Sequence, residues 1–96
     1  MKYVFTQAAE ADLANIWDYT LETWGFEQAR LYSLSIKEAC HDLCAGLRQH
    51  RSADHVRSGY YKTFVARHAL YFKTDGDTIT IVRILHQSMD AGQHLR

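Results

Sequence analysis

Apolar residues recur every three to four positions through the first half of the chain. In residues 7–24 this stripe consists of Ala9, Leu13, Ile16, Trp17, Thr20 and Trp24. In residues 27–48 it consists of Ala29, Tyr32, Ile36, Ala39, Cys40, Leu43 and Leu47. Such spacing predicts two amphipathic helices with their large rings in the core. Thr6 suits the N-cap of the first helix and Gly25 its end, so the helices are predicted to form an antiparallel hairpin.

The second half of the chain changes to short runs rich in aromatic and β-branched residues. These runs cover residues 60–66, 68–74 and 78–86, with a strong Asp-Gly-Asp turn signal before the last. A further short edge strand is expected at residues 2–6. Helices followed by adjacent strands with short turns predict an α+β fold. In it, an N-terminal antiparallel helical hairpin packs on one face of a small antiparallel β-sheet.

The last predicted strand contains an arginine in an otherwise apolar run. Regular alternation places four side chains on one of its faces: Ile79, Ile81, Arg83 and Leu85. A single helical hairpin covers only one face of a small sheet, and an unpaired buried charge is very costly. The face that bears Arg83 is therefore expected to stay open, and its apolar neighbours indicate a surface that binds a partner.

Length and charge narrow the possibilities further. The 96 residues suit a single domain, 1–96, and no apolar run is long enough to span a bilayer or to act as a signal peptide, so a soluble, cytoplasmic protein is expected. The net charge is zero, but residues 1–46 carry three bases and seven acids, and residues 47–96 carry eight bases and four acids. This asymmetry indicates an acidic partner for the second half, or charges that are simply solvated.

Cysteine spacing gives no sign of a disulfide or a metal site. Cys40 and Cys44 lie four residues apart within a predicted helix, which places both thiols on one face in a geometry that does not suit a disulfide. A zinc site needs further ligands, and His41 points off that face. Both cysteines are expected to be packing residues, and no metal or cofactor is expected.

Several basic residues and histidines fall on or beside the predicted strands. They are Lys62, Arg67, His68, Arg83 and His86. In a shared cleft they would cradle an RNA phosphate, with histidine as acid or base, which is the chemistry of a ribonuclease. Strand alternation opposes this interpretation because it directs Arg83 and His86 to opposite faces.

Residues 59–95 resemble the C-terminal half of ParE toxins, within the RelE/ParE toxin superfamily. The resemblance is most specific at the Arg67-His68 pair and in "VRILHQSMD" from Val82 to Asp90, and "AEADLANIWDYTLETWG" is similar to the family's first helix. It implies a toxin of a type II toxin–antitoxin pair that blocks DNA gyrase and stabilises its cleaved-DNA complex. A ribosome-dependent mRNA endonuclease of the RelE type, or a non-toxic antitoxin-binding module, are the alternatives.

The resemblance also implies partners and contact residues. A ParD-like antitoxin is expected to form a hetero-oligomer with the toxin and to lie on the face with Ile79, Ile81, Arg83 and Leu85. Target binding is expected at Arg67, His86, Gln87 and Met89. For the nuclease alternative the expected set is Lys62, Arg67, Arg83 and His86. Nucleic acid is expected to be met only indirectly, through gyrase or through the antitoxin on its operator.

Overall fold

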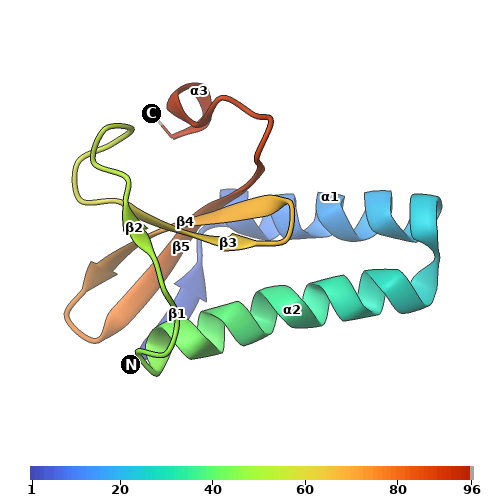
Figure 1. Ribbon diagram of the computed structural model, residues 1–96, viewed down its shortest axis with the longest axis horizontal. Coiled ribbons are helices and arrows are strands. Elements are labelled where there is room, and N and C mark those ends of the chain that lie inside the picture. Colours follow the sequence, from blue (N-terminus) through green and yellow to red (C-terminus); the bar gives the residue numbers. More distant parts are fainter. Residues whose placement is uncertain (96) are drawn as a thin grey trace.

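Two long helices cover one face of a five-stranded sheet in the computed structural model, which describes residues 1–95 (Figure 1). The elements are β1 (Lys2–Phe5), α1 (Gln7–Trp24), α2 (Phe26–Cys44), β2 (Arg51–Ser52), β3 (Tyr61–Val65), β4 (His68–Asp75), β5 (Thr78–His86) and α3 (Ala91–His94). The strand order is β1-β5-β4-β3-β2. The predicted α+β fold, with a helical hairpin on one face, is confirmed.

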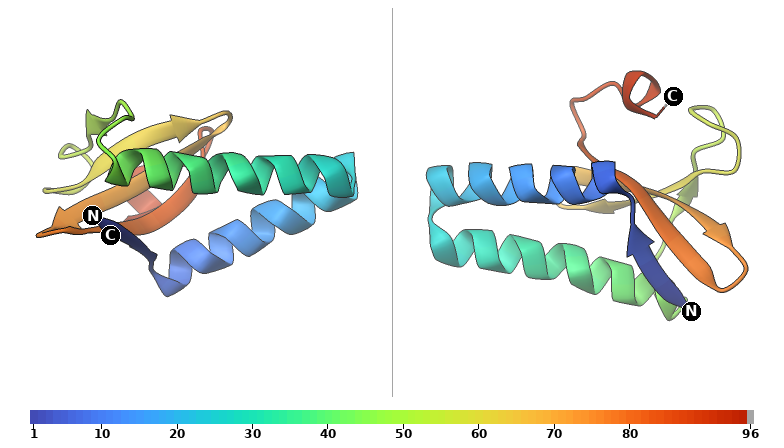
Figure 2. Two further views of the ribbon diagram at one scale, coloured as in Figure 1. Left: turned by 90° about the horizontal axis from the view of Figure 1, so that it is seen from below. Right: turned by 180° about the vertical axis from the view of Figure 1, so that it is seen from behind.

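The sheet is mixed rather than wholly antiparallel. Strands β3, β4 and β5 form the predicted antiparallel meander, and β2 adds two residues at its outer edge. The N-terminal strand β1 runs parallel to β5 and beside it, as the right-hand view of Figure 2 shows. In this pairing Lys2 lies beside Thr78 and Phe5 beside Ile81. Helices α1 and α2 separate β1 from the meander along the chain, and a connection of this length permits a parallel pairing that a short hairpin turn does not.

Local capping sets the ends of both helices. The Thr6 hydroxyl accepts a hydrogen bond from Ala9 N, and Gly25, with φ of 92°, ends α1, as predicted. Helix α2 ends at Cys44, four residues before the predicted end. Gly46 has φ of 74°, and the amide of Leu47 donates to the carbonyl of Asp42, which is the hydrogen-bond pattern of a glycine-terminated helix.

The helical hairpin is longer than the sheet and projects beyond it (Figure 1). Its far end therefore has no strand to pack against. Trp24, predicted as core, is 68% exposed, and Tyr19 and Phe26 beside the turn are exposed as well. Leu47, also predicted on the apolar stripe, is 78% exposed because it lies past the end of α2. Within residues 1–95 no helix is both long and apolar enough to cross a lipid bilayer.

The main core lies between the hairpin and the sheet. Its buried residues on the sheet are Val65, Leu70, Phe72, Ile79, Ile81 and Ile84. The helices contribute Ala9, Ile16, Ile36, Ala39, Cys40 and Leu43. Burial raises the pKa of the Cys40 thiol to about 12, so this cysteine is an unreactive packing residue, as expected.

A β-bulge in β5 changes which residues face the helices. Tyr71 pairs with Arg83 and Phe72 with Ile81, which leaves Val82 as an extra residue. Side chains on either side of this point are therefore out of phase, and both Ile81 and Ile84 face the helices. The prediction that Ile79, Ile81, Arg83 and Leu85 share one face is wrong, because regular alternation does not hold through the bulge.

The second face of the sheet is covered as well. Leu85 packs there in a smaller core together with Ala53, Ala69, Tyr71 and Leu95. In Figure 1 the C-terminal α3 and the loop after β2 lie together over this side of the sheet. The expected open face is consequently not open, because the 53–60 loop and the C-terminal tail supply a second layer that the sequence pattern did not indicate.

Candidate functional site

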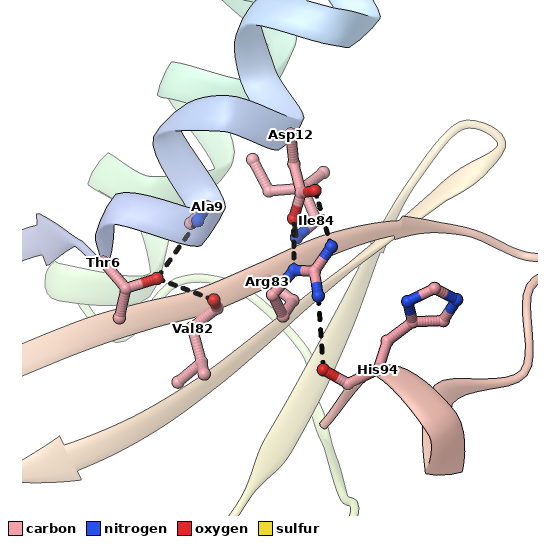
Figure 3. A network of polar contacts seen from close by, with 7 residues as sticks. All are labelled: Thr6, Ala9, Asp12, Val82, Arg83, Ile84 and His94. Atoms are coloured by element: carbon pink, nitrogen blue, oxygen red, sulfur yellow. Dashed lines mark hydrogen bonds and ion pairs between the residues drawn. The ribbon is translucent and has the colours of Figure 1, made fainter. Parts of the chain in front are cut away.

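Arg83 is held by a carboxylate from the first helix (Figure 3). Its Nε and Nη2 donate to the two carboxylate oxygens of Asp12 at 2.7 and 2.8 Å, and its Nη1 donates to the carbonyl of His94 at 3.2 Å. Asp12 also accepts from the amide of Ile84 at 2.9 Å. The two side chains are 22% and 12% exposed, so the ion pair is largely shielded. The hydrogen bonds to Asp12 raise the pKa of Arg83 above its usual value.

This ion pair explains why an arginine interrupts an apolar strand. Strand β1 pairs with the edge of β5 only as far as Ile81. Beyond Ile81, the side chains of Thr6 and Asp12 form hydrogen bonds with the backbone of β5. The Thr6 hydroxyl donates to the carbonyl of Val82, and the carboxylate of Asp12 accepts from the amide of Ile84. The expectation that Arg83 lies on an open face is wrong, because Asp12 and the C-terminal tail hold its guanidinium. Asp12 was missed because it lies beside the apolar stripe, where an acidic residue is usually solvated.

A groove of about 740 Å³ opens between the hairpin and the turn that joins β3 to β4. It is lined by Ile16, Tyr19, Thr20, Trp24, Gln28, Tyr32, Ala66, Arg67, His68 and His86. Of the predicted site residues, Arg67, His68 and His86 come together here. We call it the hairpin groove; it has aromatic walls from the helices and a basic floor from the strands.

Tyr32 and His68 are joined at the floor of this groove. The Tyr32 hydroxyl donates to the carbonyl of Val65 at 3.1 Å and lies 2.6 Å from His68 Nδ1. A hydroxyl has one proton, so His68 Nδ1–H is the donor in the second bond. That assignment leaves the lone pair of a neutral His68 on Nε2. Tyr32, predicted as a core ring, packs half-buried against the main core and also lines the groove.

His86 presents the opposite tautomer. Its Nδ1 accepts from the amide and hydroxyl of Ser88, at 3.1 and 2.8 Å, which places the proton on Nε2. Its ring meets that of His68 edge to face, with centroids 5.3 Å apart. Burial and the neighbouring His86 together lower the pKa of His68 below 6.5, against an opposing effect of Asp12. The groove therefore presents a hydrogen-bond acceptor at His68 Nε2, a donor at His86 Nε2 and the guanidinium of Arg67.

The turn that carries Arg67 is strained and braced. Ala66 has φ of 50°, a left-handed conformation that costs a residue with a β-carbon about 1–2 kcal/mol. Gln87 holds the turn: its amide donates to the carbonyl of Arg67 and its side chain to that of Ala66, both at 2.9 Å. Gln87 thus positions Arg67, whereas Met89 lies exposed in the C-terminal tail.

The four residues of the nuclease alternative do not gather at one place. Arg67 and His86 line the hairpin groove, but Arg83 is engaged by Asp12 on the edge of β5. Lys62 lines a different pocket, beside β2, with its ammonium 5.5 Å from the ring of Phe64. Lys62, Arg83 and His86 would have to move together before the first two could hold a phosphate beside a catalytic histidine.

Stability is expected to depend on pH through His68. Because its pKa is lowered in the folded state, the unfolded chain binds the proton more readily below pH 6.5. The free energy of unfolding should therefore fall as the pH drops from 6.5 through the folded pKa, and be insensitive to this group above that range. Urea unfolding of the wild type and of His68→Gln between neutral and acid pH measures this. The variant should lose less stability on acidification.

His55→Gln, in an exposed loop, is the matched control for the loss of one histidine. It should follow the wild-type pH profile. If His68→Gln and His55→Gln show the same profile, His68 does not couple folding to pH.

Sequence and structure comparisons identify the family. Residues 3–91 match the family described as ParE toxin of type II toxin-antitoxin system, parDE. The chain belongs to the ParE toxin family. It is 38% identical over 95 residues to Toxin ParE1 of Mycobacterium tuberculosis (strain ATCC 25618 / H37Rv), covering 98% of this chain and 97% of the relative. It is 31% identical over 93 residues to Toxin ParE1 of Caulobacter vibrioides, covering 97% and 96%.

A solved structure shares the fold of this ParE-family chain. The match is to "Chromosomal ParDE TA system from P. aeruginosa", with a TM-score of 0.76 and 26% identity, over 90% of this chain and 95% of that one. The resemblance drawn from the Arg67-His68 pair and the end of β5 is confirmed at the level of the family. The roles expected for single residues stay predictions.

Proposed function

We propose that this protein acts as a toxin that inhibits DNA gyrase and stabilises the enzyme's cleaved-DNA complex, and that a ParD-like antitoxin neutralises it. The observation that supports this most directly is the match to the ParE family over residues 3–91. Since gyrase works on the bacterial chromosome, the proposed action takes place in the cytoplasm.

The hairpin groove is the surface we propose for the target. It is concave, and the turn that presents Arg67 is held by Gln87 in a strained conformation, a feature that often marks functional sites. Arg67 is exposed, and it forms no ion pair with any other residue in the range 1–95. Arg67 and His86 would thus meet polar or acidic groups on gyrase, with Met89 as an apolar contact nearby in sequence.

The exposed end of the helical hairpin is the surface we propose for the antitoxin. Tyr19, Trp24 and Phe26 are all more than half exposed there, and Leu31 and Leu34 add apolar surface along α2. Large apolar side chains exposed in this number at one end of the molecule favour a protein partner. The sequence predicted antitoxin contacts at Ile79, Ile81 and Leu85, but all three are buried. The antitoxin would have to enter the main core to reach Ile79 and Ile81, and the smaller core to reach Leu85.

Supercoiling and DNA-cleavage assays with purified gyrase test the proposal. The wild-type protein should inhibit supercoiling and increase cleaved DNA, and equimolar antitoxin should restore supercoiling. Arg67→Ala/His86→Ala should need roughly tenfold more protein for the same inhibition, since each contact contributes about 0.5–1.5 kcal/mol. Arg30→Ala, on the outer surface of α2, is the matched control and should inhibit as the wild type does.

Translation on programmed ribosomes is the assay for the alternative. The Tyr32–His68 pair in the hairpin groove is the observation that favours it, because a histidine joined to a tyrosine is suited to proton transfer. Cleavage of mRNA with no effect on gyrase would replace the gyrase proposal by the nuclease. Binding of the antitoxin with neither activity would point to a non-toxic antitoxin-binding module.

A further inference from the structure

A cluster of positive charges lies at the β2–β3 edge of the sheet and shares no residue with the hairpin groove. A pocket of about 610 Å³ there is lined by Arg48, Gln49, His50, Arg51, Lys62, Thr63 and Phe64. None of these lining residues carries a carboxylate. The ion pairs found in residues 1–95 involve Arg30 and Arg83, so Arg48, Arg51 and Lys62 have no acidic partner in the described part of the chain. We call these three cations the basic edge.

Arg51 and Lys62 stand directly opposite each other on β2 and β3. Like charges in this position repel and destabilise a sheet. Both cations lie against the ring of Phe64, with Arg51 Cζ at 6.0 Å and Lys62 Nζ at 5.5 Å from its centroid. The ring, which is 41% exposed, holds them together without neutralising them. An anion between them would relieve the repulsion.

Arg48 is fixed at the same edge by neutral acceptors. Its Nε donates to Thr63 Oγ1 at 3.1 Å and its Nη2 to the carbonyl of Phe64 at 2.6 Å, while the Thr63 hydroxyl donates to the carbonyl of Gln49 at 2.8 Å. These bonds set the orientation of the guanidinium but leave its charge unpaired. Its Nη1 is engaged by no residue that the structure describes. The fixed plane lowers the entropic cost of binding an anion.

We propose that the basic edge binds the phosphate backbone of a nucleic acid directly. Three cations on one open edge match successive phosphates of a polymer better than a single enclosed anion. Residues 47–67 carry five bases and one acid, 5 − 1 = +4, so the surrounding segment reinforces the attraction. The exposed ring of Phe64 beside the cations favours a nucleic acid over an acidic polypeptide, because bases stack on aromatic side chains. The proposal does not depend on gyrase being the target.

Fluorescence anisotropy of a labelled DNA duplex with the purified protein tests this. At about 50 mM salt the wild type should bind, and the logarithm of the affinity should fall with the logarithm of salt with a slope of roughly −2 to −3, as about three phosphate contacts require. Arg51→Gln/Lys62→Gln should bind at least about tenfold more weakly, with the slope reduced by about 1.4–1.8. Arg48 is left unchanged because it also holds the edge of β3.

Lys2→Gln/Lys37→Gln is the matched control, since it removes two exposed positive charges on β1 and α2. It should keep the wild-type slope, and thermal melts should show that both double variants are folded. Single-stranded DNA and duplex RNA of equal length identify which nucleic acid is preferred. An equal loss of binding in the control would overturn the proposal, because binding would then reflect net charge alone. Binding of polyglutamate but of none of the nucleic acids would overturn it in favour of an acidic polypeptide.

Discussion

Asp12→Ala is expected to lower the free energy of unfolding by about 2–3 kcal/mol and the melting temperature by roughly 10–20 °C. The substitution removes the acceptor for two guanidinium bonds and for the amide of Ile84. It leaves Arg83 largely shielded and without a counter-charge, which is the costly outcome for a buried ion pair. The partial exposure of both side chains places the expected value below the 3–5 kcal/mol of a fully buried pair. Thermal and urea unfolding of the isolated protein measure it.

Asp18→Ala is the control, because Asp18 lies exposed on the same helix. Its effect should stay within about 0.5 kcal/mol. A double-mutant cycle with Arg83→Ala separates the ion pair from other losses and should give a coupling of about 1–3 kcal/mol. Arg83→Ala is itself expected to destabilise the fold, because it leaves Asp12 without its counter-charge. Should Asp12→Ala melt together with the wild type, the ion pair contributes nothing to stability.

Leu85→Ala is expected to cost about 2–5 kcal/mol of folding stability. Leu85 is 2% exposed in the smaller core, where it packs with Tyr71 of β4 and with Leu95 of the C-terminal tail. Truncation removes apolar contact and leaves a cavity that this thin layer closes only in part. The tail is also held by Arg57, which donates to the carbonyl of Leu95, and by Arg83, which donates to that of His94. Loss of the packing should therefore loosen the tail first.

Hydrogen exchange and thermal unfolding distinguish this role from a surface role. In Leu85→Ala the amides of residues 91–95 should exchange faster than in the wild type, and the melting temperature should fall. Leu47→Ala is the matched control because it removes the same atoms from an exposed side chain, and it should be neutral within about 0.5 kcal/mol. A Leu85→Ala protein with unchanged stability and weakened antitoxin binding would restore the open-face interpretation.

Several parts of the candidate site followed from local sequence signals. Arg67, His68 and His86 were singled out on or beside the predicted strands, and the structure brings them together in the hairpin groove. Tyr32 was expected only as a core ring, because its role depends on where the helical hairpin crosses the sheet. Arg48 was not a candidate at all, since its loop carries no periodic pattern and its acceptors are on β3.

The sequence by itself determined the helices, their Thr6 and Gly25 caps, the meander and the order of these elements. These features rest on interactions between residues a few positions apart, so periodicity and capping residues report them. Only the tertiary structure decided that β1 joins the sheet parallel to β5, that a bulge at Val82 shifts the alternation, and that the C-terminal tail covers the second face. The partner of Arg83 belongs to the same class: Asp12 is 71 positions away, and no local pattern specifies a contact that exists only once α1 lies against the free edge of β5.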